Sequence, residues 1–313
     1  MRTIKFGLFI SMIVLFVAGC SVFHSPSWNQ VEIGTTHTIE RIQFTSDGRG
    51  YLVTNGGEIF AYENDGWNEI ANPDTLNLPL YDMDVFGNIV YICGGDDSNS
   101  VVIKIDTSGN ASVIMRDTLG GLTGIDGLDT NSIWVCGNDV IYYFNGSYWA
   151  PKYLANSWDP HPFKVGALSG ETAFFVASKD SGSVLLKYSN GTWNTVTLGN
   201  GDKLNDIFFL NRSTGYIVGN ENKIYYYNGS VFIEDTSMEN LDISLYAVYK
   251  SDINSGYIVG GLGSGLNSTI YRFNQGKWEK EEGVKNAILR TVYYSDENDV
   301  WIGGDLGKLF HKH

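Results

Sequence analysis

A short apolar phrase recurs seven times along the chain, and its spacing limits the folds that the sequence can adopt. In each copy an aromatic or small residue precedes β-forming residues, usually followed by glycine. The equivalent positions are Val53, Ile92, Val135, Val176, Val218, Val259 and Ile302, separated by steps of 39, 43, 41, 42, 41 and 43 residues. A β-rich period near 41 residues is typical of the blades of a β-propeller.

Each copy predicts four short strands. In the fifth copy these are residues 204–209, 216–218, 223–227 and 230–234. The last two flank Asn228-Gly229, a strong hairpin signal because both residues tolerate positive φ. The sequence therefore predicts an all-β fold with four-stranded blades.

The two ends of residues 27–313 complement each other. The last copy stops after a third strand at residues 308–310, whereas residues 27–33 resemble the fourth strands at 67–70 and 193–196. We expect the N-terminal strand to close the last blade, which removes open sheet edges. Because residues 27–313 comprise seven units of 41 residues, the prediction is a seven-bladed propeller.

The first residues have the pattern of a processing signal. Basic Arg2 and Lys5 precede an apolar stretch at 6–17 that is short for a membrane span. The sequence Val17-Ala18-Gly19-Cys20 resembles the lipobox of bacterial lipoproteins. The resemblance implies a signal peptide at 1–19, lipidation of Cys20 and a short tether at 20–26, ahead of the propeller that the repeat predicts at 27–313. It also implies a cell-envelope protein, in the outer membrane where the organism has one, since Ser21 follows the cysteine. An ordinary signal peptide with an incidental cysteine is the alternative.

The charge excludes some partners. The formal net charge is -14, and removal of Arg2 and Lys5 takes it to -16. This disfavours nucleic acid, whose binding is dominated by phosphate neutralisation, and broad adhesion to anionic lipid. Acyl chains remain as the means of membrane attachment.

Two further cysteines occupy the same repeat position in adjacent blades. Cys93 and Cys136 should be roughly 10 Å apart, the distance between packed sheets. That is too far for a disulfide, so buried thiols are predicted, with a redox or metal role as the alternative.

A candidate ligand site lies at the start of the innermost strands. One position there mixes both charges, aromatic rings and an amide, which suits a peptide or another polar organic ligand. Its members are Glu40, Tyr81, Thr123, Lys164, Asn205, Tyr246 and Arg290. Trp158, in the loop at 156–162, is expected on the same face. The alternative is that strand ends are polar because they meet solvent.

The turns between second and third strands are acidic, and a ring of carboxylates there could hold Ca²⁺. They contain Glu58, Asp96, Asp97, Asp139, Asp180, Glu221 and Asp305. The favoured interpretation is that Asp and Asn are good turn residues. The chain has no EF-hand pattern, and no cofactor is predicted.

No catalytic signature marks the chain, which lacks HExxH and Gly-x-Ser-x-Gly. Residues 46–53 and 251–260 resemble the BNR-like propellers of the photosystem II assembly-factor and sortilin type. Residues 190–193 match only the end of the sialidase Asp-box, which argues against a sialidase. The resemblance implies a binding or assembly module for a protein, peptide or glycan. The alternative is a glycoside hydrolase or lyase that uses carboxylates at the channel mouth.

Overall fold

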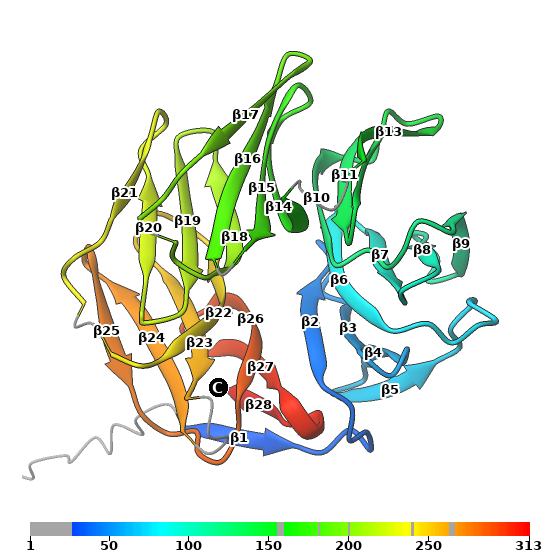
Figure 1. Ribbon diagram of the computed structural model, residues 1–313. Helices are drawn as coiled ribbons and strands as arrows, with labels where there is room; N and C mark the ends of the chain where they lie inside the picture. The colour runs from blue at the N-terminus through cyan, green and yellow to red at the C-terminus, as the bar shows by residue number, and fades with distance from the viewer. Residues whose placement is uncertain (1–26, 155–159, 181, 200, 239–240, 263–266) are drawn as a thin grey trace, which may run out of the picture.

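Seven four-stranded antiparallel sheets surround a central channel in the computed structural model, which describes residues 27–154, 160–180, 182–199, 201–238, 241–262 and 267–313. The sheets are arranged as the blades of a propeller (Figure 1). The fold is the predicted all-β seven-bladed propeller. The 3-10 helix η1 (Asp305–Gly307) is the one helical element that these residues form.

Six blades each consist of four consecutive strands. The first contains β2 (Ile39–Phe44), β3 (Gly50–Thr54), β4 (Ile59–Glu63) and β5 (Gly66–Ile70). The second contains β6 (Leu80–Phe86), β7 (Ile89–Gly95), β8 (Ser100–Ile105) and β9 (Ala111–Asp117). The third contains β10 (Gly124–Asp129), β11 (Ser132–Gly137), β12 (Val140–Phe144) and β13 (Trp149–Leu154). The fourth contains β14 (His161–Ser169), β15 (Thr172–Lys179), β16 (Gly182–Ser189) and β17 (Thr192–Val196). The fifth contains β18 (Leu204–Asn211), β19 (Thr214–Gly219), β20 (Ile224–Tyr227) and β21 (Phe232–Glu234). The sixth contains β22 (Ser244–Lys250), β23 (Gly256–Gly261), β24 (Ser268–Asn274) and β25 (Lys277–Glu281).

The seventh blade joins the two ends of the described chain. It contains β26 (Leu289–Asp296), β27 (Asp299–Gly304), β28 (Leu309–Lys312) and, on its outer edge, β1 (Trp28–Val31). In Figure 1 the blue strand β1 lies beside the red strand β28. Trp28 pairs with Lys312, and its indole Nε1 donates a 2.9 Å hydrogen bond to Glu281 of the sixth blade. The predicted closure by the N-terminal strand is confirmed.

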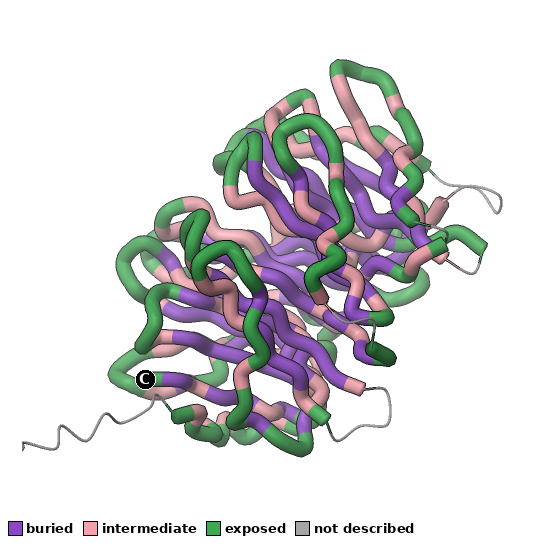
Figure 2. The backbone as a smooth tube through the Cα atoms, turned by 90° about the vertical axis from the view of Figure 1, so that its left-hand side faces the viewer, coloured by how far each residue is buried: buried purple, intermediate pink, exposed green. Residues whose placement is uncertain are grey.

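The hydrophobic core lies between the blades. Successive side chains of a strand point to opposite faces of the sheet. In β3, Leu52 therefore packs with Trp301 of the seventh blade, and Val53 packs with Ile92 of the second. Figure 2 shows the result, with buried stretches along the strands and exposed turns at their ends.

A β-bulge interrupts the innermost strand near its start in six of the seven described blades. The ladder skips one residue, and such bulges redirect the skipped side chain. The skipped residues are Glu40, Tyr81, Phe163, Asn205, Tyr246 and Arg290. The strand pairing also corrects the alignment of the repeats by one residue in three blades. The residues equivalent to Val53 are Cys93, Cys136 and Gly303, where the sequence alignment had placed Ile92, Val135 and Ile302.

Cys93 and Cys136 are buried free thiols, as the spacing predicted. Burial raises the pKa of both thiols well above their usual range. Within the described ranges, no helix has the length and apolarity needed to cross a membrane.

Candidate functional site

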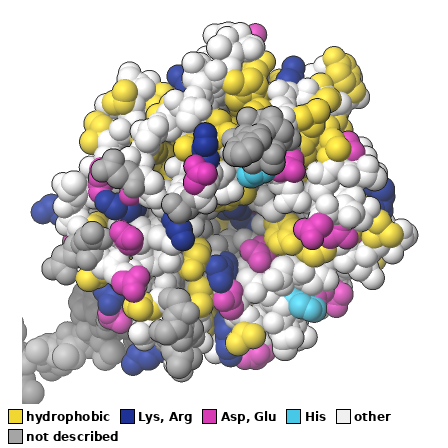
Figure 3. All heavy atoms as spheres, in the orientation of Figure 1, with side chains coloured by type: hydrophobic (Ala, Val, Ile, Leu, Met, Phe, Trp, Pro, Cys, Tyr) yellow, Lys and Arg dark blue, Asp and Glu magenta, His cyan; other side chains and the backbone are white. Residues whose placement is uncertain are grey.

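Five of the residues predicted for the ligand site at the channel mouth are the residues that the β-bulges skip. Glu40, Tyr81, Asn205, Tyr246 and Arg290 lie at the start of their innermost strands, at one end of the channel. The space-filling view in Figure 3 shows side chains of both charges around a hollow at the centre of the ring. The bulges thus place these five residues in equivalent positions around the channel.

Lys164 does not belong to this ring. In the fourth blade the bulge falls on Phe163, so Lys164 lies one position further along the strand, opposite Val176. Thr123 precedes β10, and its hydroxyl donates a 2.9 Å hydrogen bond to the carbonyl of Phe163. The predicted register was therefore wrong by one residue at Lys164.

Two of the ring residues are held by neighbouring groups. Arg290 forms an ion pair with Asp305, with 2.7 Å between Nε and Oδ1, and its guanidinium lies 4.2 Å from the ring centroid of Tyr246. The Asn205 amide donates 2.8 Å hydrogen bonds to Asn220 and to a backbone carbonyl of the sixth blade. These contacts fix the geometry of the mouth.

Glu40 and Tyr81 differ from their neighbours. Neither the Glu40 carboxyl nor the Tyr81 hydroxyl has a hydrogen-bond partner among the residues that the structure describes. Burial raises the pKa of Glu40 to about 7, although Lys164 and Arg290 oppose that shift. Burial and the nearby Glu40 charge raise the pKa of Tyr81. Both polar groups are therefore available to a ligand at the mouth.

Other predicted features have local roles or lie outside the description. Trp158 falls outside the described residues. Among the acidic turn residues, Glu58 pairs with His37 at 2.7 Å and Asp139 pairs with His161 at 2.5 Å. Within the described ranges, no three or more His, Cys, Asp or Glu side chains are grouped so that they could hold a metal ion.

A charged network crosses the channel beneath the mouth, and the sequence analysis did not identify it. The Asp82 carboxylate lies 3.1 Å from Arg41 Nε and accepts a 2.9 Å hydrogen bond from Lys164 Nζ. The Asp82 side chain is only 5% exposed. Burial opposes the charge on Lys164, but Asp82 and Asp206 hold its pKa above the usual value.

Channel side chains also bind neighbouring blades to one another. The innermost strand of each blade pairs with another strand on one side only. The N–H groups on its other side therefore need hydrogen-bond acceptors from outside the sheet. Asp206 accepts a 3.1 Å hydrogen bond from the Val248 N–H, and Thr291 accepts a 3.2 Å hydrogen bond from the Ile42 N–H. Asp84 accepts a similar hydrogen bond from the third blade, and Asp126 accepts one from the fourth. Several charged channel residues are therefore structural.

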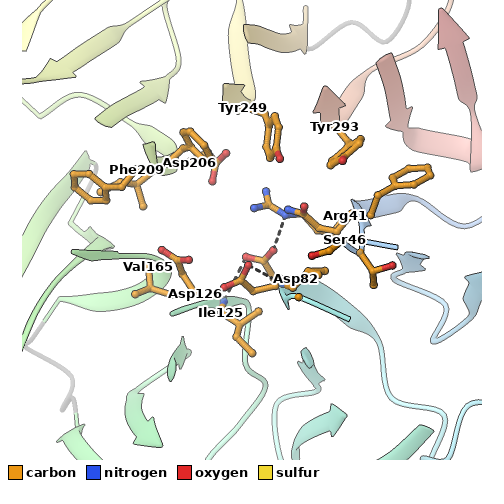
Figure 4. A pocket seen from close by; sticks show the side chains of 18 residues that line it. Arg41, Ser46, Asp82, Ile125, Asp126, Val165, Asp206, Phe209, Tyr249 and Tyr293 are labelled. Atoms are coloured by element: carbon orange, nitrogen blue, oxygen red, sulfur yellow. Dashed lines mark hydrogen bonds and ion pairs between the residues drawn. The ribbon is translucent and has the colours of Figure 1, made fainter. Parts of the chain in front are cut away.

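A cavity of about 350 Å³ begins at this network, since Arg41 and Asp82 are among the residues that line it. It extends from the level of Asp82 and Asp206 to the β2–β3 turn at Ser46 and the β6–β7 turn at Gly87. Figure 4 shows side chains from several blades pointing into it, with the Arg41 guanidinium near its centre. The cavity thus opens on the face opposite the predicted mouth. The sequence contains one signal for this charged channel. Asp82 and Asp84 occupy alternate positions of an otherwise largely apolar strand, so both belong to the same side of the sheet.

Comparison with known proteins identifies relatives in structure but not in sequence. No family model matches the chain, and no curated protein sequence matches it. YCF48 from Cyanidioschyzon merolae has a TM-score of 0.71 at 17% identity, covering 92% of this chain and 99% of its own. A structure of YCF48 bound to D1 peptide has a TM-score of 0.70 at 17% identity and covers 92% and 96%. Virginiamycin B lyase from Staphylococcus aureus has a TM-score of 0.73 at 14% identity, covering 92% and 99%. At these identities the likeness concerns the fold, and the chain is a seven-bladed β-propeller of the same architecture.

Proposed function

We propose that this protein is a lipid-anchored propeller that binds a peptide or protein segment at the channel mouth without catalysing a reaction. The observation that carries the proposal is Glu40, a largely buried carboxyl that lacks a hydrogen-bond partner. The Glu40 oxygens remain open to solvent, so a ligand at the mouth can reach them. A hydrogen bond donated to this carboxylate would be charge-assisted and contribute about 1.5–3 kcal/mol.

A peptide suits the surroundings of Glu40. Its backbone offers both N–H donors and carbonyl acceptors. Glu40 can accept, the Tyr81 hydroxyl can donate or accept, and the stacked Arg290–Tyr246 pair presents a flat surface with positive charge. The structure of YCF48 with D1 peptide supports this ligand class, because it shows that a propeller of the same architecture binds a peptide.

The proposed anchor is Cys20, at the bacterial cell envelope and in the outer membrane where one exists. Eight residue steps separate Cys20 from Trp28, a reach of about 28 Å when fully extended. The register places the start of β1 at the same end of the blade as the β26–β27 turn. The mouth lies at the opposite end, so an anchor at Cys20 would leave it facing away from the bilayer.

Peptide and glycan arrays probed with the full-length protein in detergent test the proposal. We expect saturable binding to peptides, lost or at least tenfold weaker in Glu40→Gln and in the double variant Tyr81→Ala and Tyr246→Ala. Glu69→Gln, at an exposed carboxyl of β5, is the matched control and should bind as the parent does. Binding to glycans but not to peptides would show that the ligand is a carbohydrate and would overturn the peptide proposal. Binding that survives both mouth variants would place the ligand elsewhere.

A further inference from the structure

We infer that the channel cavity below the Arg41–Asp82–Lys164 network binds an organic monocation, such as an alkylammonium or guanidinium group. Figure 4 shows carboxylates and tyrosines from different blades converging on this space. Its volume of about 350 Å³ exceeds that of such a group and its alkyl stem. The site is independent of the proposed peptide site, because the network separates it from the mouth.

The balance of charges in the channel favours a cation. Arg41 and Lys164 supply two positive charges, and Asp82 and Asp206 supply two negative charges near them. The remaining carboxyls, Asp84 and Asp126, share a side-chain hydrogen bond, which requires a proton on one of them. The Asp84–Asp126 pair therefore carries one negative charge when it holds this proton and two when it has lost it. Because the other four charges cancel, the channel is net negative in both states.

Gln43 provides a second, independent indication of a ligand. It lines the cavity and is only 8% exposed. Its carboxamide has no hydrogen-bond partner in the described part of the chain. The amide faces the open space of the cavity, and its oxygen could accept a hydrogen bond from an ammonium or guanidinium group.

The walls also suit an organic cation rather than a bare metal ion. Tyr249 and Tyr293 line the cavity, and a tyrosine hydroxyl can accept a hydrogen bond from a cation. The described acidic side chains do not form a group that could hold a metal ion. Ammonium and guanidinium groups need only separate hydrogen-bond acceptors, which the carboxyls and Gln43 supply.

The carboxyl pair makes cation binding depend on pH. Burial raises the pKa of Asp84 to about 6, and burial together with Asp84 raises the pKa of Asp126 well above its usual range. Arg41 and Asp82 also act on the pair, and Asp206, Tyr249 and Tyr293 line the same cavity. A bound cation stabilises the ionised pair, so binding should release a proton and affinity should rise from pH 5 to pH 8.

Isothermal titration calorimetry of the full-length protein in detergent tests this inference. The probes are butylammonium, with butanol as its neutral counterpart, and acetyl-Gly-Lys-Gly-amide, with the norleucine peptide as its counterpart. Titrations in two buffers of different ionisation enthalpy measure proton release. The variants are Asp84→Asn, Asp126→Asn and Gln43→Leu, and the control is Asp129→Asn, an exposed carboxyl at the end of β10.

We expect binding of a cationic probe at pH 8, at least tenfold weaker at pH 5 and in Asp126→Asn, and unchanged in Asp129→Asn. Binding of butylammonium would identify a free small amine as the ligand class, whereas binding of the lysine peptide alone would identify a basic side chain. Equal binding of the neutral counterparts would overturn the inference. So would the absence of binding at millimolar concentration in a protein whose folding is verified by circular dichroism.

Discussion

Lys250 in the sixth blade occupies the position that Phe44 occupies in the first. Each is paired with the glycine that begins the second strand of its blade, Gly50 or Gly256. Phe44 packs among aromatic rings between the seventh and first blades. Lys250 is 1% exposed, and its Nζ lies 3.1 Å from the ring centroid of Phe273 without a hydrogen-bond partner. A lysine thus takes the place of an aromatic ring in one of the inter-blade cores.

This replacement predicts that Lys250→Met stabilises the protein, most strongly at low pH. Burial lowers the pKa of Lys250 to about 7 from its ordinary value of 10.5. Between these values the unfolded chain binds the proton more readily, so the stability of the parent should rise with pH across this window. Below pH 7 the fold must bury the charged amine. We expect Lys250→Met to raise the free energy of unfolding by about 2 kcal/mol at pH 6 and to remove the rise between pH 7 and 10.

Urea unfolding at several pH values measures this effect. Lys179→Met, at an exposed lysine of β15, is the control and should leave the pH profile unchanged. The same pH profile in Lys250→Met and the parent would contradict the assignment of the effect to Lys250.

A hydrogen bond at Thr291 joins the first blade to the seventh, and its contribution to stability can be measured by substitution. Its hydroxyl accepts the hydrogen bond from the Ile42 N–H, and the residue is fully buried. Thr291→Val keeps the shape but leaves that N–H without an acceptor, which should cost about 1–3 kcal/mol. Thr291→Ser retains the acceptor and should cost less in the same urea measurement. If the valine variant is as stable as the parent, the hydrogen bond makes no net contribution.

Removal of residues 27–33 should open the ring. The edge of β28 would lose its pairing with β1, and an exposed edge can pair with another molecule. We expect a lower melting temperature and aggregation in light scattering. Removal of residues 21–26 alone, which leaves β1 intact, is the control. A shortened protein that stays monomeric and melts like the parent would show that β1 is dispensable.

The proposed lipid anchor predicts the behaviour of Cys20→Ala. Without the thiol, acylation cannot occur, so the protein should move from the detergent phase to the aqueous phase on Triton X-114 partition or remain unprocessed. Metabolic labelling with a palmitate analogue measures acylation directly. Label that persists in the alanine variant would refute acylation at Cys20.

The sequence alone determined the number and composition of the blades. The period near 41 residues and hairpin signals such as Asn228-Gly229 are local properties, and each blade is built from consecutive residues. The missing fourth strand of the last repeat likewise predicted its pairing with β1. These features could be predicted because strand alternation and turn chemistry are encoded within a few residues.

Only the tertiary structure determined which side chains meet in the channel. The bulge at Phe163 moved Lys164 out of the mouth and brought it to Asp82, a residue 82 positions away in the sequence. The charges near Glu40 and the hydrogen bond that Asp206 accepts likewise come from other blades. The position of a bulge is set by the hydrogen bonds between two strands and by the packing of their blades. No short segment of sequence contains that information, so the repeat predicted the ring and the assembled ring determined the site.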